Sequence, residues 1–164
     1  NGGMSRFEKF KHYHSQFLNK KLSQVEILDL ADSFSDLVVQ KVIKSKNVPG
    51  VLSFLKEAGK KYKLFISTGT PEDEINLILQ GKGIKSYFEK VYGSPSKKTE
   101  HIKKIKNNYS YKSNNLVFFG DSITDLCAAN STNVPFILIE NQFNNELSLS
   151  YKGKKIKNFI SFKI

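Results

Sequence analysis

Residues 116–125 read Leu-Val-Phe-Phe-Gly-Asp-Ser-Ile-Thr-Asp, and this stretch decides the fold class. Its first four residues form a continuous apolar run, which is typical of a strand that is covered on both faces of a parallel sheet. Gly120 permits a tight turn directly after the strand, and Ile123, Leu126 and Ala129 then follow at helical spacing. The stretch therefore predicts a strand that leads straight into a helix, as in parallel α/β proteins.

The same alternation continues on both sides of this stretch. Short apolar runs at Leu64–Ile66 and Phe136–Ile139 are expected to be buried strands, and a short extended segment is expected around Val91–Tyr92. Helices are expected between them, one of which is opened by Thr70-Pro71. Strands that alternate with helices predict an α/β fold with a parallel sheet and right-handed crossovers. The weak alternation of residues 157–164 indicates an edge strand.

Amphipathic helices fill the first part of the chain. Two capping-box patterns, Ser5-x-x-Glu8 and Ser23-x-x-Glu26, are each followed by apolar residues at helical spacing. The resulting helical hairpin cannot bury its apolar stripes by itself. We therefore divide the chain into a helical part, residues 1–46, and an α/β core, residues 47–164, whose first helix is expected to begin at Pro49.

The composition narrows the class of protein. The chain has 164 residues, of which 39% are hydrophobic, enough for one core of ordinary size. No apolar run approaches the ~18 residues of a membrane span, and the single cysteine excludes a disulfide framework, so we expect a cytoplasmic protein without a membrane partner. The net charge is +11, but Arg6 is the single arginine among 26 basic residues. Because base readout and phosphate gripping depend on guanidinium groups, a nucleic-acid partner is disfavoured, and the lysines are interpreted as a solvated surface.

Polar residues follow two of the expected strands at their carboxyl ends. Ser67-Thr68-Gly69 follows one, Asp121 and Asp125 follow the other, and Lys98 begins a helix between them. In an open parallel sheet, ligands bind outside the carboxyl ends of the strands, where helix starts offer N–H groups to anions. Two carboxylates four residues apart can approach one hard cation such as Mg²⁺. The sequence therefore predicts a site for a phosphate and its metal, although each residue could also be an ordinary helix cap.

Three segments, in this order, resemble motifs two, three and four of the haloacid dehalogenase superfamily of phosphatases: LFISTGT at 64–70, GSPSKKT at 93–99 and FGDSITD at 119–125. The resemblance covers nearly the whole chain and is to phosphoglycolate-phosphatase-like members. It implies a Rossmann-like core preceded by the remnant of a helical cap, which residues 1–46 would form. It also implies a magnesium-dependent phosphomonoester hydrolase that acts on a small phosphorylated metabolite.

The resemblance gives roles to the residues that would contact the phosphate. Ser67 would hydrogen-bond the transferring phosphoryl group, and Thr68 and Gly69 would lend it backbone N–H groups. Lys98 would offset the phosphate charge and orient the nucleophile. The spacing after the Gly-Ser-Pro element places this lysine at Lys98 rather than at Lys97.

The remaining candidates are a pair of carboxylates and one arginine. By the resemblance, Asp121 would be the direct Mg²⁺ ligand, and Asp125 a second ligand or a holder of bound water. Arg6 could bind a substrate carboxylate or a second phosphate, although a solvated surface arginine is the simpler interpretation. His101 is expected to be exposed and Cys127 to be a small buried residue, so neither enters the predicted site.

The family's first motif, a buried strand that ends in Asp-x-Asp-x-Thr, does not occur in the sequence. The first Asp of that motif is the nucleophile and the second is the general acid–base. Its strand would be central, so we expect the strands after residues 63 and 115 to lack their shared neighbour. The chain is then the carboxyl-terminal part of a longer phosphatase and inactive alone. If it is complete, the alternative is a non-catalytic phosphate- and metal-binding module. The phosphate ester and the oligomeric state stay open.

Overall fold

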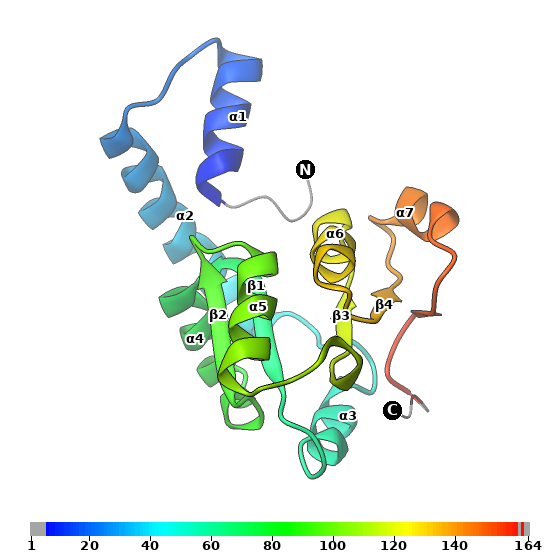
Figure 1. Cartoon of the computed structure of the whole chain (residues 1–164). Helices are drawn as coiled ribbons and strands as arrows, with labels where there is room; N and C mark the ends of the chain where they lie inside the picture. Colours follow the sequence, from blue (N-terminus) through cyan, green and yellow to red (C-terminus); the bar gives the residue numbers. More distant parts are fainter. Residues whose placement is uncertain (1–5, 161, 163–164) are drawn as a thin grey trace.

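The structure, a computed structural model, describes residues 6–160 and residue 162. It has the expected α/β architecture, with the helical part at one end (Figure 1). The helices are α1 (Arg6–Leu18), α2 (Gln24–Lys44), α3 (Val51–Ala58), α4 (Glu72–Gly81), α5 (Lys98–Asn108), α6 (Ile123–Thr132) and α7 (Asn145–Ser150). The strands are β1 (Phe65–Pro71), β2 (Lys90–Ser94), β3 (Phe118–Gly120), β4 (Phe136–Ile139) and β5 (Lys155–Ile156). None of the described helices has the length and apolar character needed to cross a membrane.

The first two helices form the expected hairpin, which extends away from the sheets (Figure 1). Ser23 caps α2, and its hydroxyl and backbone exchange hydrogen bonds with Glu26, as the capping-box pattern predicts. Phe10 on α1 meets Phe34 on α2 edge to face, with ring centroids 5.8 Å apart. The capping pattern expected before α1 involves Ser5, which lies outside the described residues.

Two parallel sheets make up the core. β1 pairs with β2, with Phe65 opposite Lys90, and β4 lies between β3 and β5. Across the molecule the order is β2, β1, β3, β4 (Figure 1), but β1 and β3 belong to separate sheets. Within the described residues no strand pairs with both, which agrees with the expectation that these two strands lack a shared neighbour.

Helix α5 connects the two halves, because it packs against β1 and against α6. Its apolar side brings Ile102 to Ala128 and Val134, which are all more than nine-tenths buried. A second apolar cluster lies on the other side of α6, where Ala129 packs against Phe136 and Leu138 of β4. These contacts hold the carboxyl ends of β1 and β3 near the starts of α5 and α6.

The carboxyl-terminal tail differs from the expectation. The last of the described strands is β5, at Lys155–Ile156, and residues 157–160 form none. Residues 161, 163 and 164 of the expected edge strand lie outside the described residues. The ring of Phe159 instead lies 4.6 Å from that of Phe54 on α3, and the Phe159 N–H donates to the carbonyl of Pro49 at 2.9 Å. Aromatic burial against α3 therefore replaces sheet pairing.

The start of the first core helix, beside the same tail segment, also differs from the prediction. Gly50 has a φ of +80°, and α3 begins at Val51 rather than at Pro49. A Cβ on Gly50 would lie 2.4 Å from the backbone nitrogen of Ile160, so the left-handed turn and the tail contact both require glycine here.

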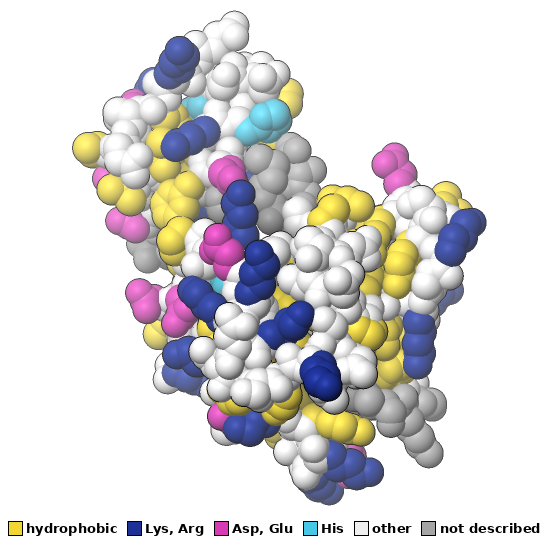
Figure 2. Space-filling model, viewed as in Figure 1, with side chains coloured by type: hydrophobic (Ala, Val, Ile, Leu, Met, Phe, Trp, Pro, Cys, Tyr) yellow, Lys and Arg dark blue, Asp and Glu magenta, His cyan; other side chains and the backbone are white. Residues whose placement is uncertain are grey.

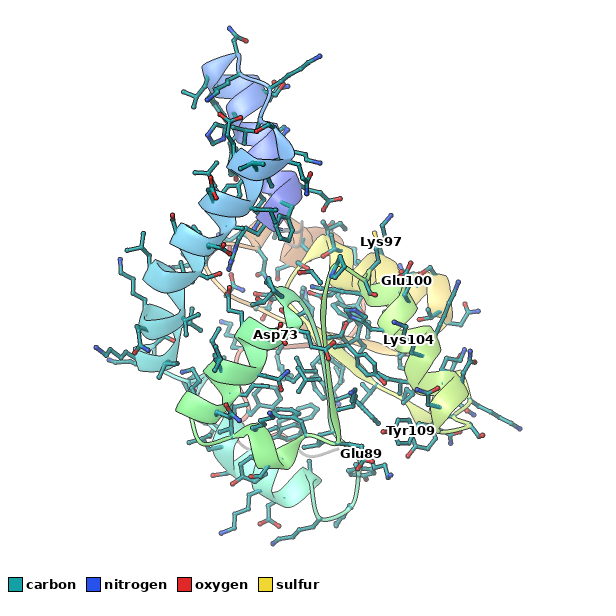
Figure 3. All side chains as sticks on the ribbon, turned by 90° about the vertical axis from the view of Figure 1, so that its left-hand side faces the viewer. Asp73, Glu89, Lys97, Glu100, Lys104 and Tyr109 are labelled. Carbon is teal, nitrogen blue, oxygen red and sulfur yellow. The ribbon has the colours of Figure 1, made fainter. Side chains whose placement is uncertain are left out.

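The lysines are spread over the face shown in Figure 2 and do not gather on one element. Lys97, directly before α5, and Lys104 on α5 are exposed, and Glu100 lies on the same side of the helix (Figure 3). At the far end of β2, Lys63 contacts Glu89 at 3.1 Å, near the ring of Tyr109. This arrangement is typical of a solvated surface.

Candidate active site

Lys98 and Asp125 form an ion pair between the first turns of α5 and α6. Lys98 Nζ lies 2.6 Å from Asp125 Oδ1, and the two side chains are 16% and 5% exposed. Both residues were predicted for the site, and the structure brings them together from 27 residues apart in sequence. A fixed ammonium with a buried carboxylate beside it is thus present at the carboxyl ends of the strands.

Asp125 has a second role as the capping acid of α6. Its Oδ2 accepts hydrogen bonds from the Ser122 hydroxyl at 2.6 Å and the Ser122 N–H at 3.1 Å, which completes a capping box. Gly120 makes this close approach possible, since a Cβ there would lie 2.4 Å from the Asp125 Cβ. Gly120, Ser122 and Asp125 of the Gly-Asp-Ser-x-x-Asp element therefore pack together in one turn.

Asp121 lies at the exposed end of the same turn and contacts the loop after β4. Its Oδ2 accepts a hydrogen bond from Asn141 Nδ2 at 3.1 Å. Asn144 is 8% exposed and donates to the backbone carbonyls of Asp121 and Ile139 at 2.8 and 2.9 Å. The β4–α7 loop thus fixes the position of Asp121.

An open pocket of about 720 Å³ lies between these elements. Its lining includes Lys98 of α5 together with Asp121 and Ser122 of the turn before α6. The rest of its lining is Ile123 and the residues of the β4–α7 region, namely Asn141, Gln142, Phe143, Asn144, Asn145, Glu146 and Leu147. Lys98 and Asp121 therefore face the same space.

Ser67 is held by a buried histidine. Ser67 Oγ lies 2.9 Å from His101 Nδ1, and His101 Nε2 lies 3.1 Å from the carbonyl oxygen of Gly93. His101 is 1% exposed and stacks on Tyr92 with ring centroids 5.5 Å apart. Burial lowers the pKa of His101 and so favours the neutral imidazole. The hydrogen bond to the Gly93 carbonyl is among the smaller effects that act in the opposite direction.

The end of β1 after Ser67 is irregular in its pairing with β2 and carries hydrogen bonds of its own. The Thr70 N–H donates to Thr68 Oγ1 at 3.2 Å, and the two hydroxyls lie 3.3 Å apart. Ser67, Thr68 and Gly69 are not among the residues that line the pocket. The structure thus places the predicted residues in two groups, one on β1 and one around the Lys98–Asp125 pair.

Arg6 is engaged away from this pocket. Its guanidinium contacts both carboxylate oxygens of Glu74 on α4, at 2.6 and 2.7 Å, and donates to Ser35 Oγ at 2.5 Å. It also lies over the ring of Phe34, 4.6 Å from its centroid. In this structure Arg6 therefore joins the helical hairpin to the core, and it is not the solvated surface residue of the simpler interpretation.

The two aspartates of the turn fit a magnesium site that is completed by water and phosphate, and do not by themselves form a closed metal site. No group of three or more His, Cys, Asp or Glu side chains in the described part of the chain is placed to hold one. Mg²⁺ is usually held by one or two carboxylates together with water and substrate phosphate. Asp121 and Asp125 supply suitable oxygen donors for such a site, although Asp125 Oδ1 is paired with Lys98 and Asp125 Oδ2 accepts two hydrogen bonds from Ser122.

Residues 4–139 match the family of haloacid dehalogenase-like hydrolases. The chain belongs to this family. The match confirms the resemblance that the three motif-like segments indicated. Comparison with curated proteins finds no match.

Solved structures agree on the fold of this hydrolase. CbbY from Rhodobacter sphaeroides in complex with xylulose-(1,5)bisphosphate has a TM-score of 0.80 at 14% identity, over 96% of this chain and 74% of that one. β-Phosphoglucomutase from Clostridium difficile has a TM-score of 0.77 at 21% identity, over 99% and 74%. A predicted phosphoglycolate phosphatase from Haemophilus somnus has a TM-score of 0.76 at 18% identity, over 96% and 75%. These likenesses confirm the Rossmann-like α/β fold.

Two side chains differ from their predicted exposure, and one residue beside the pocket was not predicted. His101 was expected to be exposed and is buried, whereas Cys127 was expected to be buried and is exposed. The spacing to Ile105, one turn later on the buried side of α5, was the available signal for His101. Asn144 was missed, although it follows β4 at its carboxyl end, where ligand sites of parallel sheets are found.

Proposed function

We propose that this chain supplies the phosphate and metal site of a magnesium-dependent phosphomonoester hydrolase that acts on a small phosphorylated metabolite, and that it lacks the nucleophile of the reaction. The observation that carries the proposal is the Lys98–Asp125 ion pair beside the pocket that Asp121 also lines. An ammonium suited to a phosphate oxygen and a carboxylate suited to a cation face one space, in a chain of this family.

In this proposal the phosphate is held by residues of two elements. Lys98 contributes positive charge, and its Asp125 partner fixes where the ammonium points. The Ser67 hydroxyl and the backbone N–H groups of Thr68 and Gly69, at the carboxyl end of β1, contribute hydrogen bonds to the phosphoryl oxygens. The roles assigned to these groups are those that the family resemblance implies.

Asp121 would be the main protein ligand of Mg²⁺, with Asp125 as a second ligand or as the holder of a bound water. When bound, Mg²⁺ neutralises charge on the phosphoryl oxygens and orients them. Asn141 and Asn144 keep the Asp121 carboxylate and backbone in place from the β4–α7 loop. Asp125 keeps its capping bond to Ser122 throughout, so the turn does not need to rearrange.

The size of the pocket supports a small substrate, since about 720 Å³ lies within the range of small-molecule sites. We assign residues 1–46 to the cap remnant and residues 47–164 to the core, with α1 and α2 near the substrate side. The exposed thiol of Cys127 has no disulfide partner and fits a reducing, cytoplasmic compartment.

Phosphoryl transfer through the nucleophilic Asp of the family's first motif needs a carboxylate that is free to attack. The residues assigned above do not supply one. Asp125 is held by Lys98 and Ser122, and Asp121 is assigned to the cation. We therefore propose that residues 1–164 by themselves bind phosphate in a magnesium-dependent manner and do not hydrolyse phosphate esters.

The test is calorimetric titration of the full chain with inorganic phosphate, in Mg²⁺ and in EDTA. We expect binding in Mg²⁺, marked weakening in EDTA, and loss of the Mg²⁺ effect in Asp121→Asn. Asp73→Asn is the matched control, because Asp73 is an exposed acid in the first turn of α4 (Figure 3), outside the pocket. Equal binding in Mg²⁺ and EDTA would contradict the proposed metal site.

A second candidate function is a non-catalytic phosphate-binding module. The lack of an Asp-x-Asp-x-Thr segment in the sequence favours it, because that segment would supply the nucleophile. Hydrolysis of p-nitrophenyl phosphate separates the candidates once the chain is joined to a strand that carries Asp-x-Asp-x-Thr. Turnover in Mg²⁺ supports the hydrolase, whereas a thermal shift with phosphate and no turnover supports the module.

A further inference from the structure

His101 makes two hydrogen bonds whose directions can be assigned. Its Nε2 lies 3.1 Å from the Gly93 carbonyl oxygen, which can only accept, so Nε2 carries a proton. In a neutral imidazole the other nitrogen must then accept. The Ser67 hydroxyl, 2.9 Å from Nδ1, therefore donates its only proton to His101.

This direction opposes the role proposed for Ser67. A serine that donates to His101 presents only lone pairs to a ligand, and lone pairs repel an anion. When both ring nitrogens are protonated, Nε2 still donates to Gly93, while Nδ1 donates to Ser67 Oγ. The Ser67 proton is then free to point to a phosphoryl oxygen.

We propose that His101 is a positioning residue, which sets the direction of the Ser67 hydroxyl and takes up one proton when a dianion binds at Ser67. This inference rests on the proposed phosphate site. His101 acts through Ser67 and does not touch the ligand. The bound proton stays on Nδ1, and it returns to solvent when the anion leaves.

The surroundings of His101 suit such a coupling. Burial disfavours the charged ring, and Lys104 on α5 adds to this, so the pKa of free His101 is lowered. Glu100 on α5 and Glu72 at the start of α4 act in the opposite direction, and Tyr92 on β2 covers the ring. The carboxylate of Asp125 on α6 is also charged, but it is paired with the Lys98 ammonium.

The coupling has a definite sign. Because the anion favours the protonated form of His101, binding at a pH above the His101 pKa must withdraw a proton from solution. The affinity for a dianion then falls by about tenfold per pH unit in that range and is constant below it. Without His101, this dependence disappears.

The first measurement is ¹⁵N NMR of the ligand-free full chain with labelled histidines. We expect His101 to be neutral near pH 7.5 with its proton on Nε2. The opposite tautomer, or a charged ring at that pH, would overturn the proposal. This measurement needs no variant, so it remains decisive even if changes at the buried His101 prevent folding.

The second measurement is titration with sulfate, in Mg²⁺, by calorimetry in two buffers of different protonation enthalpy. Sulfate remains a dianion over the accessible pH range, so every proton taken up belongs to the protein. We expect uptake close to one proton for the wild type and for His12→Gln, a control at an exposed histidine of α1. His101→Gln should bind sulfate with no proton uptake and no comparable pH dependence.

The outcomes separate the two proposals. Sulfate binding without proton uptake in the wild type would overturn the role of His101 and leave the phosphate site intact. Absence of sulfate binding, checked by NMR at high sulfate concentration, would overturn both. Ser67→Ala adds a further check, because it should weaken binding and abolish proton uptake while the Nε2 proton of His101 remains.

Discussion

Arg6 and Glu74 form a two-pronged ion pair that joins α1 to α4 across 68 residues of sequence. The Nη–Oε distances are 2.6 and 2.7 Å, and the side chains are only 9% and 7% exposed. Ser35 on α2 donates to the same carboxylate at 2.7 Å. Both helices of the hairpin are therefore attached to the core through one buried carboxylate.

Removal of the arginine should loosen this attachment. Arg6→Ala leaves Glu74 buried without its cation, which costs about 3 kcal/mol or more in unfolding free energy. Urea unfolding followed by circular dichroism measures the loss. Lys60→Ala is the control, because Lys60 pairs with Glu57 on the surface and such pairs contribute little. Equal effects of the two changes would show that the buried pair has no special role.

The same pair predicts a loss of stability in acid. Burial alone would raise the pKa of Glu74, but the hydrogen bonds from Arg6 and Ser35 outweigh it and hold the pKa below its usual value. A carboxyl whose pKa is lower in the folded state stabilises the fold above its unfolded pKa, and this contribution disappears as the pH falls through the folded pKa. Melting temperatures measured downward from pH 5 should fall less steeply in Glu74→Gln than in the wild type. Parallel curves would contradict the prediction.

The loop after β4 offers a test of how Asp121 is positioned. Asn144→Ala removes donors to the Asp121 and Ile139 carbonyls and an acceptor for the Asn141 N–H. Leaving such buried groups unpaired costs about 1–3 kcal/mol. We expect weaker magnesium-dependent phosphate binding together with this loss of stability. Asn130→Ala is the control, since Asn130 is exposed on α6 and does not line the pocket, and it should lower neither quantity.

Apolar runs and turn residues were sufficient to predict the presence of β1, β2, β3 and β4, but not β5. The strand at Phe136–Ile139 has the predicted bounds, because a short run of large apolar residues between polar ends has few alternatives. The choice of Lys98 over Lys97 rested on spacing within the motif, and in the structure Lys98 is the one that meets Asp125.

Side-chain partners were harder to predict, because they depend on which distant segments meet. Nothing near His101 in sequence shows that Ser67 and the Gly93 carbonyl will lie on either side of its ring. The sequence around Arg6 likewise does not indicate that Glu74 is its partner. The position of the tail was wrongly predicted for the same reason. Phe159 packs on Phe54, and this contact between distant segments was not visible in the weak apolar alternation of the tail.

The two adjacent lysines at the start of α5 give the sharpest test of the site. Lys98→Met keeps the length of the side chain but leaves the Asp125 carboxylate, 5% exposed, without its cation. We expect a loss of about 2 kcal/mol in unfolding free energy and phosphate binding weaker by at least about tenfold, or about 1.4 kcal/mol. Lys97→Met is the matched control, because Lys97 is exposed on the outer side of the helix (Figure 3). If Lys97→Met weakens phosphate binding and Lys98→Met does not, the motif lysine is Lys97, and the ion pair with Asp125 is only structural.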